Sequence, residues 1–216
     1  MSSKSSPSIP LDAAGPAPPA RAPTPLPPPV NDGLSPTALA RRAVEAFVLR
    51  REILDFAADP ASALWPGPAA CFVCLKTLAG KLRGCIGTVE PARQSLAAEI
   101  VHNAIGAATR DPRFPPVSAD ELLLLRYTVD VLEAPEPAEI EDLDPSEFGV
   151  IVEDNNGRRR GLLLPAIEGV ELVCDQIQIA ARKAGIASGE PHKLYRFRVQ
   201  RFREAAGART SQSKES

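Results

Sequence analysis

The sequence predicts an α+β fold in which an antiparallel or mixed β-sheet is covered by helices. Strand-like segments follow one another across short turns, as in hairpins, and helical segments do not alternate with single strands as a repeated βαβ fold requires. The composition supports a packed core, since 44% of the 216 residues are hydrophobic and 24% are charged. These observations indicate one domain or a closely joined pair.

The two ends of the chain differ in composition from its middle. Residues 1–33 contain 10 of the 23 prolines and are rich in Ser and Ala. Proline lacks the N–H that helices and central strands need, so this segment is predicted to be a disordered tail, serving either for solubility or as a docking site for a Pro-binding module. Residues 204–216 are small and polar and are predicted to be a second disordered tail. The folded domain is therefore expected to span residues 34–203.

The folded part is predicted to begin with a helix and a hairpin. Ser35 can cap a helix, and Pro36 suits its first position. Residues 71–77 have the composition of a strand, Ala79-Gly80 supplies a turn, and residues 81–89 return as a second strand. The remaining predicted elements are a helix over 91–109, a short helix after the Ser118–Glu121 capping box, strands over 127–132, 148–152 and 161–164, a helix over 172–184, and a last strand over 195–199.

Charge and hydropathy exclude several classes of protein. The net charge of -2 gives no general attraction to phosphate backbones or anionic lipid. No apolar stretch approaches the roughly 18–20 residues of a membrane-spanning helix, and the start of the chain has no apolar signal region. We therefore expect a cytoplasmic protein whose four cysteines are reduced thiols.

Cys85, in the run LRGCIGT, is the first candidate for chemistry. Because a strand points alternate side chains to opposite faces, the core face is predicted to hold Leu82, Gly84, Ile86 and Thr88, and the other face Arg83, Cys85 and Gly87. A guanidinium about 6.5–7 Å from the thiol could lower its pKa by about one unit, and Gly87 would leave room beside the sulfur. The alternative is that Cys85 is a small packed residue in a glycine-bent strand.

A thiol enzyme also needs a base, and the chain has two histidines. His102 is expected to face solvent on its helix, which makes it a weak partner for Cys85, and His192 lies in a loop. Cys71 and Cys74 are predicted to be core thiols, because positions i and i+3 of a strand face opposite ways and no second CxxC follows. Cys174 is predicted to pack within its helix. No metal and no cofactor are expected.

Two further polar features remain. Asp111 and Arg113 flank a rigid proline and could converge on one concavity to bind a substrate; the alternative is a local ion pair that braces the turn. Arginines also gather at 158–160 and 196–203, as a nucleic-acid site would require. Because Tyr195 and Phe197 are expected to face the core, no stacking platform is predicted, and a solvated arginine surface is the alternative.

The runs LRGCIGT, AATRDPRFPPV, ELLLLRYTVDVL, RRRGLLLP, QIQIAARKAGI and LYRFRVQRF, over about residues 36–203, resemble the AMMECR domain family. The resemblance implies an α+β fold with a larger and a smaller subdomain, and with the LRGCIG motif near their junction. Similar prokaryotic domains are the A component of the AmmeMemoRadiSam system, beside a Memo-like protein and a radical SAM protein. The two motifs map without departure onto residues 82–87 and 111–114 here.

The resemblance implies a fold and partners but no particular reaction. The leading hypothesis is a module that binds a small ligand or a peptide segment of a Memo-like or radical SAM partner, using Arg83, Gly84, Gly87, Asp111 and Arg113. A thiol-dependent enzyme with Cys85 as nucleophile and Arg83 as its activator is the first alternative. A nucleic-acid-associated role is the second.

Overall fold

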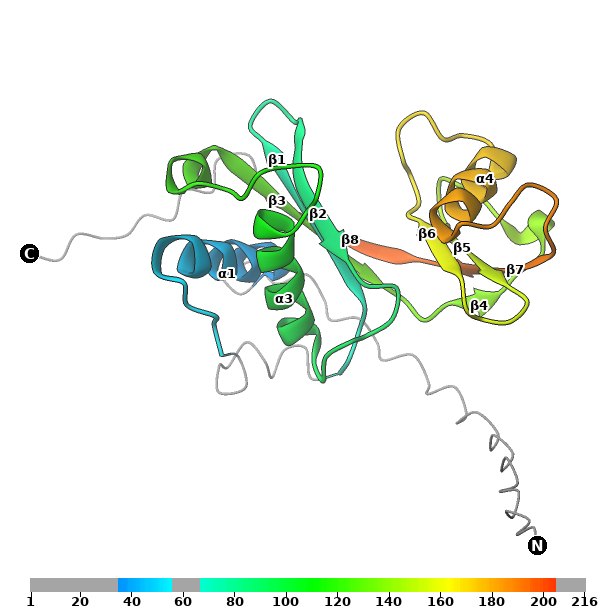
Figure 1. Ribbon diagram of the computed structural model, residues 1–216, viewed down its shortest axis with the longest axis horizontal. Helices are drawn as coiled ribbons and strands as arrows, with labels where there is room; N and C mark the ends of the chain where they lie inside the picture. The colour runs from blue at the N-terminus through cyan, green and yellow to red at the C-terminus, as the bar shows by residue number, and fades with distance from the viewer. Residues whose placement is uncertain (1–34, 56–66, 205–216) are drawn as a thin grey trace, which may run out of the picture.

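The computed structural model describes residues 35–55 and 67–204, which form two four-stranded antiparallel sheets with helices, so the α+β prediction is confirmed (Figure 1). The sequence favoured one sheet, whereas the structure has two. The predicted disordered tails lie outside the described residues, except that Glu204 is described and contacts the domain.

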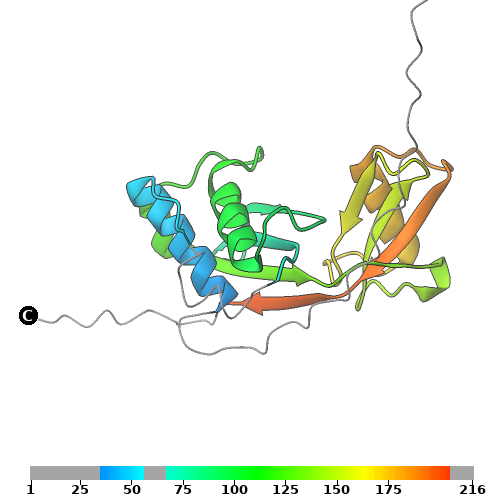
Figure 2. The same cartoon turned by 90° about the horizontal axis from the view of Figure 1, so that it is seen from below.

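The first sheet carries two helices on one face. In the order in which they pair, its strands are β2 (Leu82–Gly87), β1 (Cys71–Thr77), β3 (Leu125–Leu132) and β8 (Val199–Arg203). Helices α1 (Pro36–Arg50) and α3 (Leu96–Thr109) lie on the same side of this sheet (Figure 2). Alternate residues of β1 and β3, such as Val73 and Val129, are fully buried against these helices. The side chains that point away from the helices form the opposite face of this sheet.

The second sheet has a smaller buried apolar cluster than the first and is covered by one helix. Its strands, in pairing order, are β4 (Glu136–Pro137), β7 (His192–Phe197), β5 (Gly149–Asp154) and β6 (Arg160–Leu163). Helix α4 (Val173–Ala184) packs on β5 and β6. Two short 3-10 helices, η1 (Ala119–Leu124) and η2 (Ile140–Asp142), complete the elements. Gly161 allows α4 to approach, because a Cβ there would collide with the Ala180 carbonyl oxygen.

The two sheets are joined by the last strand of the chain. The sequence predicted a single strand over 195–199, but this segment divides at Arg198 into β7, which pairs with β5, and β8, which pairs with β3. The Arg198 carbonyl accepts a hydrogen bond from the Glu133 N–H at 2.9 Å, between the two sheets. An apolar cluster fills this junction: Ala70, Leu132, Ile151, Leu162 and Phe197. The sequence of this segment does not reveal the division, because the change of partner depends on β5 and β3, which are distant in the chain.

The helix ends follow local chemistry. The Ser35 hydroxyl accepts from the Ala38 N–H at 3.1 Å, as its capping position predicted. Helix α3 begins at Leu96, five residues after Pro91, where the predicted helix started. The reason is that Ser95 caps the helix by accepting a hydrogen bond from the Ala98 N–H. Gly185 ends α4 with a φ of 69°, the left-handed conformation that glycine adopts without strain.

Candidate functional site

The LRGCIG and DPRF motifs meet at the free edge of β2. The Cys85 backbone N–H donates to Asp111 Oδ2 at 2.8 Å, although the two residues are 26 positions apart. Asp111 also accepts from Arg113, through the backbone N–H at 3.1 Å, Nε at 2.9 Å and Nη2 at 2.7 Å. The two motifs are therefore one connected unit, in which a carboxylate fastens the end of α3 to an edge strand.

The Asp111 carboxylate is held in its ionised form. Its side chain is 2% exposed, and the hydrogen bonds from the Arg113 side chain hold its pKa well below the usual range, against the opposing effect of burial. The backbone N–H groups of Cys85 and Arg113 act in the same direction. Asp111 thus positions Arg113 and β2, and is not a proton acceptor near neutral pH.

Arg113 itself is only partly used by this contact. Nε and Nη2 point at Asp111, while the side chain is 55% exposed and its guanidinium lies 5.5 Å from the centre of the Phe114 ring. Nη1 has no hydrogen-bond acceptor among the described residues. A guanidinium fixed on one edge and open on the other can bind a carboxylate or phosphate with two parallel hydrogen bonds.

A second cation, Lys183 of α4 on the other sheet, is within electrostatic range of Arg113. Its ammonium donates to the Leu162 carbonyl at 3.2 Å, on the free edge of β6, although the residue as a whole is exposed. Desolvation against β6, followed by the positive charge of Arg113, lowers the pKa of Lys183. In the described part of the chain Lys183 has no carboxylate partner. No sequence signal pointed to it, because it is one of two adjacent cations at the end of an amphipathic helix.

Arg83 lies elsewhere than predicted. Its Nε and Nη2 donate to the two carboxylate oxygens of Glu121 at 2.6 and 3.0 Å, and Nη1 donates to the Pro115 carbonyl at 2.9 Å. Its side chain is 11% exposed, and this ion pair lowers the pKa of Glu121 to about 2. Arg83 therefore braces the loop after α3, and the prediction that it lies beside the Cys85 sulfur is wrong.

A β-bulge in β2 is the reason that Arg83 does not share a face with Cys85. Leu75 pairs with Gly84, but the next residue, Lys76, pairs with Leu82, so Arg83 is an additional residue in the edge strand. The bulge interrupts the alternation of side chains. Leu82, predicted to lie in the core, is consequently 38% exposed.

Cys85 is not a free thiol. It forms a disulfide with Cys74, the residue directly opposite it on β1, with the two Cα atoms 4.1 Å apart. Since the Cys85 N–H points outward to Asp111, the pair is a non-hydrogen-bonded one, the closer of the two antiparallel types. The predictions of reduced thiols throughout and of Cys74 as a core thiol are therefore wrong, because the sequence did not indicate the register that places the two sulfurs together.

The other two cysteines are free and differ from each other. Cys71 is buried, as predicted, and burial raises the pKa of its thiol to about 12. Cys174 is exposed, not packed, because it lies in the first turn of α4 on the side away from the sheet.

The two glycines of the motif have packing roles. A Cβ on Gly84 would collide with the Ala107 carbonyl oxygen, so the close approach of another element predicted for Gly84 is present, and that element is α3. Gly87 does not leave open space beside the sulfur as predicted, because the Phe72 ring covers it. Both glycines therefore allow β2 to lie flat against neighbouring groups.

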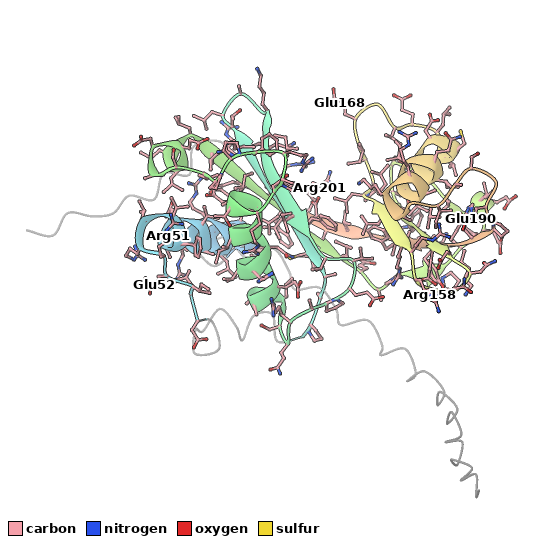
Figure 3. The ribbon with its side chains drawn as sticks, viewed as in Figure 1. Arg51, Glu52, Arg158, Glu168, Glu190 and Arg201 are labelled. Atoms are coloured by element: carbon pink, nitrogen blue, oxygen red, sulfur yellow. A yellow bond between two sulfur atoms is a disulfide. The ribbon has the colours of Figure 1, made fainter. Side chains whose placement is uncertain are left out.

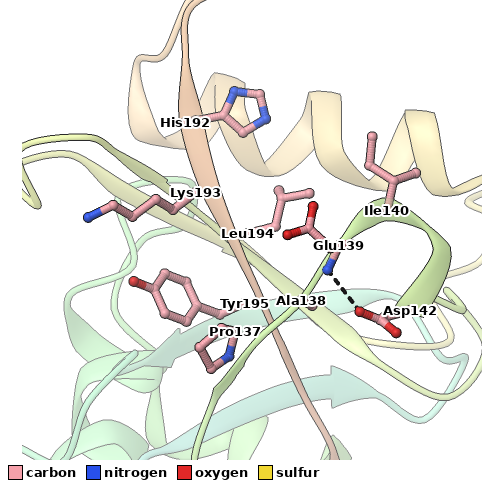
Figure 4. A pocket seen from close by; sticks show the side chains of 9 residues that line it. All are labelled: Pro137, Ala138, Glu139, Ile140, Asp142, His192, Lys193, Leu194 and Tyr195. Carbon is pink, nitrogen blue, oxygen red and sulfur yellow. Dashed lines mark hydrogen bonds between the residues drawn. The ribbon is translucent and has the colours of Figure 1, made fainter.

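Neither histidine approaches Cys85. His102 lies between Arg93 and Arg110, with Arg93 Nη2 3.0 Å from its Nδ1. Burial, and then the charges of the two arginines, lower the pKa of His102. His192 borders a groove of about 690 Å³ between η2 and β7, which the sequence did not predict because its two sides are about 50 residues apart (Figure 4). The groove is lined by Pro137, Ala138, Glu139, Ile140, Asp142, His192, Lys193, Leu194 and Tyr195.

The arginines do not form one cationic patch. Arg158 lies at the far end of the second sheet, whereas Arg201 lies on the first (Figure 3). Most of the group are paired with carboxylates: Arg159 with Asp154 and Glu190, Arg160 with Glu90 and Glu153, Arg196 with Glu136, Arg198 with Glu147, and Arg201 with Asp130. These pairs leave little net positive charge for a phosphate backbone.

Two features are absent from residues 35–55 and 67–204. No helix there is long and apolar enough to cross a membrane. No group of three or more His, Cys, Asp or Glu side chains there is arranged to hold a metal ion.

Comparison with known proteins gives consistent matches. A family profile described as AMMECR1 matches residues 37–203. A protein of Thermotoga maritima is 47% identical over 166 residues, which are 76% of this chain and 94% of that protein. A protein of Clostridium acetobutylicum is 46% identical over 171 residues, which are 77% of this chain but only 35% of that longer protein. The crystal structure of the uncharacterised protein PH0010 from Pyrococcus horikoshii superimposes with a TM-score of 0.70, at 31% identity, covering 78% of this chain and 89% of the other.

Proposed function

This chain belongs to the AMMECR1 family, and from that premise and the geometry at Arg113 we propose that it is a binding module for an anionic group on a small ligand or a peptide segment. The ligand would be presented by a Memo-like or a radical SAM partner, as the resemblance to the A component of the AmmeMemoRadiSam system implies. The module itself makes and breaks no covalent bond in this role.

The observation that carries the proposal is the fixed and half-exposed guanidinium of Arg113. Asp111 holds it by two side-chain hydrogen bonds, at 2.9 and 2.7 Å, and leaves Nη1 without an acceptor among the described residues. A side chain held in one geometry loses less conformational entropy on binding than a free surface arginine. Lys183 adds a second positive charge within electrostatic range of Arg113, and it forms no ion pair with a carboxylate among the described residues. Two neighbouring cations repel each other, and an anionic ligand between them would relieve that repulsion.

The length of one relative supports a protein partner. About two thirds of the Clostridium acetobutylicum chain lies outside the matched region, so there the domain operates within a larger polypeptide. A domain that functions beside other domains in one chain is a reasonable binding partner for separate proteins elsewhere.

The contacts of the motif residues favour binding over catalysis. Glu121 is bound by Arg83 and Asp111 by Arg113, so neither carboxylate is available as a base at neutral pH. Cys85 is engaged in a disulfide. The polar groups of the motifs therefore stabilise a rigid frame, and Arg113 presents a whole nitrogen, Nη1, without an acceptor among the described residues.

The test is partner binding by an Arg113→Lys variant. Lysine keeps the charge but lacks the planar donor fork. With purified Memo-like and radical SAM proteins from the same genome, we expect Arg113→Lys to weaken binding about tenfold, or ~1.4 kcal/mol, by calorimetry. Arg158→Lys is the matched control, since that exposed arginine lies at the far end of the second sheet. Equal affinities for wild type and both variants, or no binding of either partner, would refute the proposal.

A further inference from the structure

The disulfide lies on the face of the first sheet that its helices leave uncovered. Cys71, Val73 and Leu75 of β1 point toward α1 and α3 and are fully buried, so Cys74, between them, points to the other side. Among the described helices, only α1 and α3 pack on this sheet, and both lie on one side of it (Figure 2). Cys74 and Cys85 are each partly exposed. The pair is therefore reachable from solvent.

The register of the sheet places three cations in the row of the disulfide and in one adjacent row. Across the four strands, Cys85 pairs with Cys74, Cys74 with Thr128, and Thr128 with Arg203. In the adjacent row on the same face, Lys76 pairs with Arg126. The side chains of Lys76, Arg126 and Arg203 are all exposed. The carboxylate nearest to this row on the same face, Asp130, is already bound by Arg201, at 2.6 and 3.0 Å.

This distribution of charge distinguishes the two sulfurs. Cys74 lies on an inner strand, with Lys76 two residues away and Arg126 on the adjacent strand β3, so in the register of the sheet it lies nearer to these two cations than Cys85 does. Cys85 lies on the edge strand β2, whose backbone is bound on its outer side by the Asp111 carboxylate, itself paired with Arg113. Positive charge stabilises a departing thiolate, and edge position favours approach of a nucleophile.

We propose that Cys74–Cys85 is a thiol–disulfide exchange site for an anionic low-molecular-weight thiol, in addition to the ligand site at Arg113. The thiolate of the small molecule attacks the Cys85 sulfur, a mixed disulfide forms there, and the Cys74 sulfur leaves as a thiolate that takes up a proton. A second small thiolate attacks the sulfur of the bound small molecule. That step releases the oxidised small disulfide and the Cys85 thiolate, so two electrons and two protons reach the protein. The reverse sequence reoxidises the pair.

Trapping the intermediate tests which sulfur is attacked. The full chain carrying Cys174→Ser, to remove the exposed free thiol, is incubated with reduced glutathione, quenched with acid at early times and alkylated, so that mass spectrometry locates the mixed disulfide. We expect at least about tenfold more glutathione on Cys85 than on Cys74. Buried Cys71 should stay unmodified. Equal amounts on the two cysteines, or more on Cys74, would overturn the assignment of the attacked sulfur.

Equilibrium with glutathione tests whether the pair is exchangeable at all. In the Cys174→Ser chain, differential alkylation after incubation in buffers of graded reduced-to-oxidised glutathione ratio should show reversible interconversion of the disulfide and the dithiol in the folded protein. A disulfide that opens only when the protein unfolds, or two thiols that never join at any ratio, would overturn the proposal.

Lys76 and Arg126 allow a separate test of selection for an anionic thiol. Replacing both Lys76 and Arg126 by Gln should slow reduction by glutathione several-fold while changing reduction by the neutral thiol 2-mercaptoethanol less. The comparison within one variant separates attraction of an anionic thiol from a general change in the accessibility of the disulfide. Equal slowing by both thiols would contradict selection of an anionic thiol.

Discussion

Replacing Asp111 by Asn removes the charge that joins the two motifs while keeping the shape of the side chain. The carboxylate is 2% exposed and accepts from Cys85 and from three groups of Arg113. An amide has one acceptor oxygen and would turn its NH₂ toward a donor. Hydrogen bonds to a charged group contribute roughly 1.5–3 kcal/mol each, but Arg113 is 55% exposed and solvent compensates part of the loss. We expect a loss of about 2–3 kcal/mol in the free energy of unfolding.

The pH dependence of this loss is the diagnostic part. Because the folded-state pKa of Asp111 is depressed, its stabilising contribution is present above the unfolded pKa of about 3.9 and is lost as the pH falls toward the folded value. Urea unfolding at pH 7 and near pH 3 should therefore show a wild-type advantage over Asp111→Asn that shrinks at the lower pH. Asp120→Asn, at an exposed aspartate, is the control and should cost less than about 0.5 kcal/mol. An Asp111→Asn deficit that is absent at pH 7, or unchanged near pH 3, would refute the bracing role.

Three further predictions concern the packing of the motif residues and of the free cysteines. Gly84→Val should lower the melting temperature by more than any other single change in the motif, or prevent folding, because the side chain would meet the Ala107 carbonyl oxygen; a melting temperature within about 2 °C of wild type would contradict this. Arg83→Lys should cost about 1–2 kcal/mol in urea unfolding, since the fork to Glu121 is lost from a side chain only 11% exposed, and a neutral result would mean that the pair is not a brace. Brief alkylation of the native, unreduced chain should modify Cys174 and leave Cys71 unlabelled, which mass spectrometry can check; rapid labelling of Cys71 would contradict its burial.

Local signals in the sequence predicted much of the fold. The Ser35 cap, the turn at Ala79-Gly80 and the Gly185 helix end each depend on residues close together in the chain, and each is present in the structure. The Ser118–Glu121 capping box is present as well, although the helix it begins is a 3-10 helix. The division into two sheets was not visible, because the change of partner at Arg198 depends on tertiary packing at the apolar junction.

The candidate site was predicted in composition but not in arrangement. Asp111 and Arg113 were identified as a pair, and the structure shows the pair with the backbone of Cys85 added as a third member. The bulge that moves Arg83 away from Cys85, and the register that joins Cys85 to Cys74, depend on how one strand pairs with the next. Single-strand alternation contains no information on either.

Lys183 was missed for a different reason. Its position is set by the packing of α4 on β6, where it donates to the Leu162 carbonyl, and by the approach of the second sheet to Arg113. The groove beside His192 was missed similarly, since β7 and η2 come from distant parts of the chain. Sites built between elements that are far apart in sequence require the fold before they can be identified.

A double-mutant cycle at Arg113 and Lys183 tests whether both cations bind one anionic group of the partner. The affinity of the Memo-like or radical SAM partner is measured for wild type, Arg113→Lys, Lys183→Gln and the double variant, with unfolding curves as the check on folding. If both cations bind one anionic group, each single change weakens binding and their effects are non-additive by at least about 0.5 kcal/mol. Unchanged affinity in both single variants, with the fold intact, would contradict a ligand site at this position.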